Sequence, residues 1–153
     1  MTTQQPDRRR IRAATVTAIL LALGLLLTQC PAYRDGAPGV LAAAMSETTS
    51  AVRSAALALD LRIRDRSTAR LAAVQISDAG DELVGAYSDI AELRIEDPAD
   101  LERQHRLAEF ITTARTELGR AAANLHNLDG APRLPDLRDR LLALADELQS
   151  GYR

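Results

Sequence analysis

The fold of this chain is decided by residues 98–128, PADLERQHRLAEFITTARTELGRAAANLHNL. Apolar residues recur there in alternating steps of four and three, which is typical of a helix that buries one narrow stripe. The stripe consists of Leu107, Ile111, Ala114, Leu118, Ala121, Leu125 and Leu128. Asp97 in front of Pro98 predicts an N-cap followed by proline at the first helical position. The run DGAP at 129–132 predicts the end of the helix, because glycine and then proline stop one.

The same periodicity extends to both sides of this helix. Downstream, a stripe predicts a helix over about 135–150, formed by Leu137, Leu141, Leu144 and Leu148. Upstream, two runs follow the same steps: Leu41, Met45, Thr48, Val52, Ala55 and Leu59, then Ala69, Ala73, Ile76, Gly80, Leu83, Tyr87 and Ile90. Between the runs the pattern falls on Arg62 and Arg66, and no Gly or Pro marks a break. Residues 40–95 are therefore either one long helix or two helices joined near residues 64–67, with Asp65 or Ser67 as the second N-cap.

The composition favours helices throughout the chain. Hydrophobic residues make up 46% of the 153 residues, but aromatic residues only 3%. The apolar content is mostly Ala and Leu, which are the strongest helix formers, and β-branched residues are sparse. Narrow stripes rich in Ala suit helices that pack closely side by side. We expect an all-α fold, in which an N-terminal transmembrane or signal helix is followed by a slim antiparallel three- or four-helix bundle.

The amino-terminal segment predicts export. No charged residue occurs between Arg12 and Arg34, and residues 19–27 read ILLALGLLL. About 20 apolar residues in a helix span about 30 Å, the thickness of a bilayer core, and the four arginines before them should stay cytoplasmic. We expect a basic cytoplasmic tail at 1–12, a transmembrane or signal segment at 13–32, a linker at 33–39 and an extracytoplasmic helical bundle at 40–153. The protein is then a single-pass protein of the cell membrane.

Three fates of this segment stay open: retention as an anchor, cleavage after Ala32 with secretion of the domain, and lipidation at Cys30. Small residues at Cys30 and Ala32 suit a signal-peptidase site. Residues 27–30, LTQC, resemble a lipobox. That motif normally has a small residue where Gln29 stands, and Pro31 follows the cysteine directly. A small apolar residue at the end of a membrane helix is the competing interpretation of Cys30.

The charge distribution and the missing motifs narrow the function. From Tyr33 onward, 15 arginines stand against 20 acidic residues, a formal charge of −5, so no basic face for nucleic acid is indicated. The chain contains no lysine, which excludes a lysine nucleophile or Schiff base. It contains no phosphate-binding loop, nucleophile elbow or paired-cysteine metal site either. We predict no enzyme activity and no cofactor.

Two polar groupings on the predicted helices have the spacing of possible binding sites. Glu102 and His105 form a Glu-x-x-His pair that resembles the motif of ferritin-like di-iron bundles. That family needs the motif twice, and His126 has Ala123 in place of the second glutamate. We therefore expect both histidines on the surface or at the edge of a stripe, and no metal site.

The second grouping consists of Arg62, Arg66 and Arg70, at four-residue spacing. Such a stripe suits a phosphate, an anionic headgroup or an acidic partner. Asp60 and Asp65 lie beside it, so a solvated, ion-paired surface is the competing interpretation.

Residues 50–93 look like small exported helical proteins of actinobacteria. The resemblance rests on the Ala/Leu pattern of SAVRSAALALDLRIRDRSTARLAAVQISDAGDELVGAYSDIAEL and on its Arg-Ser-Thr joint at 66–68. It implies an exported helical protein and no particular activity. The architecture also resembles periplasmic sensor bundles, but it departs from them because no second membrane segment and no output domain are expected.

Together these features predict a non-enzymatic interaction module. It would be a membrane-tethered helical bundle that pairs with itself or with another envelope protein. The alternative is an extracytoplasmic binder of a small ligand or lipid, because bundles hold apolar ligands between their helices. The single Phe and the missing Trp disfavour an aromatic pocket for a lipid.

Overall fold

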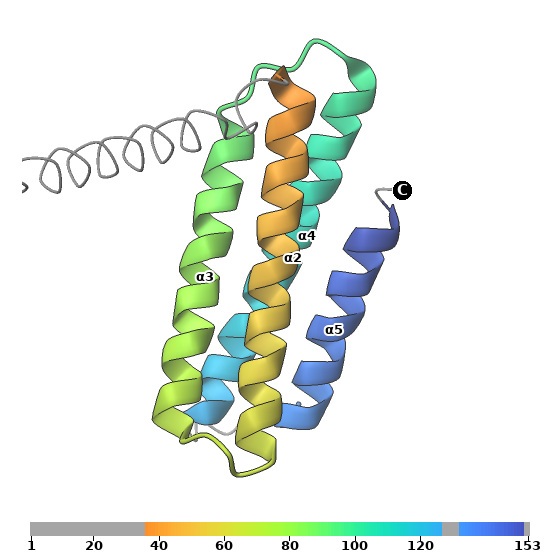
Figure 1. The fold of residues 1–153 in the computed structure, drawn as a ribbon. Helices are drawn as coiled ribbons and strands as arrows, with labels where there is room; N and C mark the ends of the chain where they lie inside the picture. Colours follow the sequence, from red (N-terminus) through yellow and green to blue (C-terminus); the bar gives the residue numbers. More distant parts are fainter. Residues whose placement is uncertain (1–35, 127–131, 152–153) are drawn as a thin grey trace, which may run out of the picture. The chain divides into compact units, whose positions relative to one another are not determined.

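The computed structural model of the chain describes residues 36–126 and 132–151. These residues form four α-helices and no strand: α2 (Gly36–Ile63), α3 (Ala69–Ala91), α4 (Pro98–Leu125) and α5 (Leu134–Gly151). Consecutive helices lie side by side and run in opposite directions (Figure 1). α2 contacts all three other helices, whereas α3 and α5 do not touch. The expected all-α helical bundle is confirmed, with four helices in the part described.

The chain divides into one unit at residues 1–34 and another at residues 35–153, and the four helices belong to the second. The predicted tail, the predicted membrane segment and Cys30 lie outside the described residues. Within the described ranges, no helix has both the length and the apolar character that a membrane span requires. α2 already begins at Gly36, so residues 36–39 of the predicted linker are helical. Pro38 is compatible with this start, because the first turn of a helix does not use its N–H groups.

The turn at residues 64–68 shows that residues 40–95 form two helices. Asp65 has a φ of 53°, the left-handed conformation that most often belongs to a glycine after a helix. Its N–H donates to the carbonyl of Arg62 at 3.1 Å, and the N–H of Arg66 donates to the carbonyl of Leu61 at 2.8 Å. These two bonds form a Schellman motif, which satisfies the last carbonyls of α2. An aspartate therefore ends this helix without the glycine that would have marked the break in the sequence.

The start of α3 corrects the predicted N-cap. Thr68 takes this role, and its hydroxyl accepts a hydrogen bond from the N–H of Leu71 at 3.1 Å. The two predicted caps, Asp65 and Ser67, are wrong. Asp65 ends the preceding helix, and Ser67 lies one residue too early, with its hydroxyl directed to the carbonyl of Thr68.

The start of α4 is as predicted. The Asp97 side chain accepts a hydrogen bond from the N–H of Ala99 at 2.8 Å, and Pro98 is the first helical residue. The helix ends at Leu125, with His126 as its C-cap. The predicted extension to Leu128 and most of the predicted stop signal fall on residues 127–131, outside the described residues.

The interior of the bundle consists of heptad stripes of Leu, Ile and Ala. The predicted stripes of α4 and α5 are largely confirmed by the buried residues Leu107, Ile111, Ala114, Leu118, Ala121, Leu125, Leu137, Leu141 and Leu148. α2 buries a wider face, because it contacts three helices, and most of the added residues are alanines. Small side chains there let the neighbouring helices approach closely and keep the interior filled.

The buried stripe of α3 differs from the predicted one. Ile76, Leu83 and Ile90 are buried as expected. The residues between them are Ala72, Ala79 and Ala86 instead of the predicted Ala73, Gly80 and Tyr87. Tyr87 is 43% exposed. Both rows satisfy the heptad pattern, and the structure buries the one made only of alanine, which turns Ala73 and Gly80 toward the edge of the helix.

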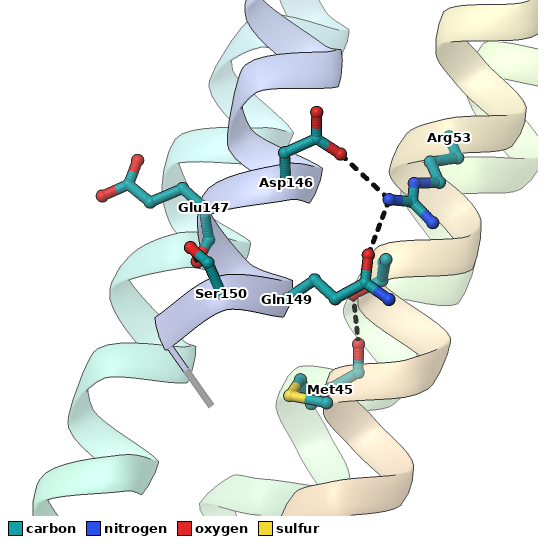
Figure 2. Close-up of polar contacts among 7 residues, drawn as sticks. Met45, Arg53, Asp146, Glu147, Gln149 and Ser150 are labelled. Atoms are coloured by element: carbon teal, nitrogen blue, oxygen red, sulfur yellow. Dashed lines mark hydrogen bonds and ion pairs between the residues drawn. The ribbon is translucent and has the colours of Figure 1, made fainter. Parts of the chain in front are cut away.

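α5 is joined to α2 by polar contacts as well as by apolar ones. Figure 2 shows Arg53 of α2 between two side chains of α5: its guanidinium donates to Asp146 at 2.9 Å and to Gln149 at 2.8 Å. Nearer the start of α5, Arg138 lies 3.2 Å from Asp60 of α2. Its hydrogen bond to Asp139, assisted by the one to Asp60, raises the pKa of Arg138 above its ordinary value.

α5 is also paired with α4 through a buried carboxylate. The Glu117 side chain is only 9% exposed, and its carboxylate accepts a hydrogen bond from Arg120 on the same helix. Its Oε2 atom lies 3.8 Å from the guanidinium of Arg140 on α5. Among the described residues, every ion pair between helices therefore involves α5.

Replacing Thr48 should stabilise the bundle. Thr48 is 1% exposed, and its hydroxyl has no hydrogen-bond partner among the described residues. Thr48→Val keeps the shape and removes this buried polar group, so we expect the free energy of unfolding to rise by about 1 kcal/mol in urea titrations followed by circular dichroism. The matched control is Thr49→Val, because the Thr49 hydroxyl donates to the carbonyl of Met45 at 2.9 Å. Equal stabilisation by both substitutions would contradict this explanation.

Candidate functional site

A continuous groove runs along the outer surface between α3 and α4, and we call it the α3/α4 groove. It consists of two adjoining hollows of about 640 Å³ and about 370 Å³, which share Ala73, Ser77 and His126. The α3 wall includes Arg70, Ala73, Val74, Ser77, Gly80, Asp81 and Val84. The α4 wall includes Arg115, Leu118, Gly119, Ala122, Leu125 and His126.

Small residues create this groove. Gly80 and Gly119 lie on opposite walls, and a Cβ atom added at either one would meet no atom within 4 Å. Ala73 and Ala122 add little more bulk. The floor is apolar, because it is formed by partly or fully buried residues such as Leu118 and the alanines. Because these residues have little or no side chain, another backbone can approach this strip closely.

Two apolar side chains stand at the rim of the groove. Val74 is 50% exposed and Val84 is 42% exposed, and both lie on the α3 wall. They lie ten residues apart, which corresponds to about 15 Å along a helix. These side chains add apolar area beside the floor of the groove, which a docked partner would cover.

The charged residues of the groove form no ion pairs with the residues that the structure describes. Arg70, Asp81 and Arg115 are exposed, and none of them forms an ion pair with another described residue. Asp81 and Arg115 line the same hollow on opposite walls. This differs from the α2/α5 side, where Arg53 and Arg138 are both paired across the helices.

The three predicted arginines do not share one helix face, because the turn at residues 64–68 separates them. Arg62 lies in the last turn of α2 and pairs with Asp65 at 2.8 Å. Arg66 lies in the turn itself, and its side chain has no ionic partner among the described residues. Arg70 lies in the first turn of α3 and is the one member that lines the α3/α4 groove. Its neighbours there include Leu125 and His126, which the sequence pattern did not connect with it.

The two histidines lie on the surface. His105 is exposed, and its neighbour Glu102 lies 3.5 Å from Arg106. His126 is exposed at the end of α4, beside the groove. In the described ranges, no three His, Cys, Asp or Glu side chains come together as a metal site would require.

A second groove, of about 470 Å³, lies along α2 beside the end of α5. It is lined by Ser46, Thr49, Ser50, Arg53, Ser54 and Leu57, and by Gln149 of α5. Its charged residue, Arg53, is already bound to Asp146 and Gln149 (Figure 2). It therefore offers hydroxyl groups and a guanidinium that is already bonded, whereas the charged residues of the α3/α4 groove form no ion pair with another described residue.

The sequence pattern missed most of the groove. It placed Ala73 and Gly80 in the buried stripe, whereas the structure leaves both at the edge, half-buried. The signal that could have found them is a second row of small residues on each helix: Ala73, Ser77 and Gly80 on α3, and Gly119 and Ala122 on α4. Comparison of the chain with protein-family models, with curated proteins and with solved structures gives no match.

Proposed function

We propose that this chain is a membrane-tethered, extracytoplasmic helical interaction module without catalytic activity. In this proposal it binds another helical surface through the α3/α4 groove. Residues 13–32 would hold the module to the membrane, either as a retained span or through lipid at Cys30.

The observation that carries the proposal is the combination of an open floor of small residues and exposed apolar side chains in one groove. Gly80 and Gly119 leave room for a second backbone, and Val74 and Val84 supply apolar area around that room. Small residues at a helix contact allow close packing and extensive van der Waals contact. The interior, by contrast, is closed by the heptad stripes, so ligand contact is favoured at the outer surface.

The dimensions of the groove suit a helix. From Arg70 to Val84 the α3 wall extends over 14 residues, or about 21 Å. A partner helix of about four turns would cover this length, and helices pack with their axes about 8–10 Å apart.

The arginines lie at the end of α2 that is remote from Gly36. The chain enters the bundle at Gly36, the first residue of α2, and Arg62 lies 26 residues further along this helix. At 1.5 Å per residue, this separates the arginine-rich end from Gly36 by about 40 Å. We propose that Arg66 and Arg70 contact an acidic protein partner.

A second candidate function is the binding of an apolar small ligand. It is favoured by the larger hollow, which has a volume of about 640 Å³ and is lined partly by Ala69, Ala73, Val74 and Leu125. Ligand pockets have volumes of about 300–1,000 Å³. Native mass spectrometry of the purified chain would show a ligand as added mass, which the interaction module does not require.

The experiment for the proposed function is site-specific photo-cross-linking of the full-length chain in the cells that produce it. A photoreactive residue at Ser77 lies in the middle of the groove, whereas one at Gln75 lies on the same helix outside it. Both positions are exposed, so both labels reach solvent equally. We expect a discrete cross-linked protein product from position 77 and at least about tenfold less from position 75, because only the groove buries its residues against a partner.

Two results would count against the proposed function. One is the same pattern of products from positions 77 and 75, which would indicate random collisions. The other is no protein product from position 77 together with a bound small molecule in native mass spectrometry, which would favour the ligand-binding candidate.

A further inference from the structure

We infer that the partner in the α3/α4 groove is a second copy of this chain, related to the first by a two-fold axis that runs along the bundle. This inference rests on the proposed function and names its partner. The interface would be formed by α3 and α4 of each copy, with each α3 facing the α4 of the other.

Contacts at both ends of α3 and α4 fix the alignment of these two helices along the bundle. Near one end the side chain of Gln104 donates to the carbonyl of Ile90, and near the other end Arg70 and His126 line one hollow. Asp81 lies nine residues before Ile90, and Arg115 lies eleven residues after Gln104. At 1.5 Å per residue these separations are about 14 Å and about 16 Å, so Asp81 and Arg115 lie at nearly the same level on opposite walls.

This placement makes the groove self-complementary. A two-fold rotation about an axis along the groove places the α3 wall of one copy over the α4 wall of the other, at the same level. Asp81 of each copy then faces Arg115 of the second copy, so two opposite-charge contacts form at once. Both residues are exposed and have no ionic partner among the described residues of their own chain.

The apolar groups of the groove match under the same rotation. Val74 lies seven residues before Asp81, and Ala122 lies seven residues after Arg115. Because α3 and α4 run in opposite directions, Val74 and Ala122 lie at the same level. The exposed Val74 side chain of each copy would therefore lie over a small residue of the other. A large group against a small one is the arrangement that lets helix surfaces interdigitate.

The opposite orientation of the two copies is disfavoured. If the two-fold axis ran across the bundle at the level of these residues, Asp81 would face Asp81 and Arg115 would face Arg115 of the second copy, and these like charges would repel each other. It would also place the two Gly36 residues at opposite ends of the pair. An axis along the bundle places both at the same end, as two copies tethered to one membrane require.

The test is a charge exchange in the full-length chain, purified in mild detergent and studied by sedimentation equilibrium. Asp81→Arg alone should weaken self-association about 100-fold, because two Arg–Arg contacts replace two ion pairs. Arg115→Asp alone should have an effect of the same size through two Asp–Asp contacts. An equimolar mixture of the two variants should recover wild-type affinity to within about tenfold, because both contacts then join opposite charges.

The double variant Asp81→Arg/Arg115→Asp guards against a folding defect in either single variant. It restores opposite charges in a dimer of identical chains, and we expect it to associate like the wild type. Three results would overturn the inference: a wild-type chain that stays monomeric at all concentrations, single variants that associate normally, or a mixture that does not recover. If the wild type is monomeric and position 77 still cross-links to a different protein, the proposed function stands and the second copy is the wrong partner.

Discussion

Leu59→Ala is expected to lower the free energy of unfolding by about 3 kcal/mol. Leu59 is fully buried near the end of α2, the helix that contacts all three others. Its removal leaves a cavity between several helices, and such substitutions cost about 2–5 kcal/mol. This is a large part of the about 5–15 kcal/mol by which domains are usually stable. Urea unfolding followed by circular dichroism would measure it.

The control for this prediction lies two residues away on the same helix. Leu57 is 59% exposed, so Leu57→Ala removes the same atoms from a position that contributes little to the core. We expect it to change the free energy of unfolding by less than about 0.5 kcal/mol. Similar losses for both substitutions would show that the buried face of α2 is assigned incorrectly.

Gly80→Leu is expected to abolish docking in the α3/α4 groove, with a loss of affinity of about 100-fold or more. A leucine at this position fills the open space between the two walls and holds a partner backbone away. The fold itself should survive, since no atom lies within 4 Å of the new Cβ and leucine is a better helix former than glycine by about 1 kcal/mol. Sedimentation of the full-length chain would measure the association.

Gly85→Leu is the matched control for this substitution. Gly85 lies on the same helix, is exposed and also has no atom near an added Cβ, but it does not line the groove. The gain in helix propensity should be the same, and association should be unchanged. If both glycine substitutions weaken association equally, the effect does not come from filling the groove.

The sequence was sufficient to predict the helices and most of the interior, because those follow from local rules. The heptad stripe of α4 and the cap at Asp97 are determined by residues a few positions apart, and both are confirmed. The break between α2 and α3 was ambiguous for a physical reason. A left-handed residue ends α2, and aspartate takes that conformation at Asp65 without the glycine that usually signals it.

The candidate site could not be predicted, because it depends on how two helices meet. The pattern could not distinguish the row of Ala72, Ala79 and Ala86 from the row of Ala73, Gly80 and Tyr87, since both satisfy the heptad. Once the first row is buried, the second becomes the edge of a groove. Asp81 and Arg115 line one hollow because α3 and α4 are aligned so that these two residues lie at the same level of the bundle. The sequence does not show this alignment.

The three predicted arginines also show that residue spacing alone does not predict a shared surface. Equal spacing of Arg62, Arg66 and Arg70 implies a common face only while the helix continues. The turn at residues 64–68 places them on three different parts of the chain, and only Arg70 reaches the groove. The four-residue spacing therefore pointed to one residue of the groove, Arg70. Whether Arg62 and Arg66 also contact a partner depends on what the partner is.

We propose the α3/α4 groove as the docking surface of this module. The most direct measurement is the yield of the cross-linked product from position 77 in three full-length backgrounds: wild type, Gly80→Leu and Gly85→Leu. We predict equal yields in the wild type and in Gly85→Leu, and a loss of at least about tenfold in Gly80→Leu. An undiminished product in the Gly80→Leu background would contradict the claim.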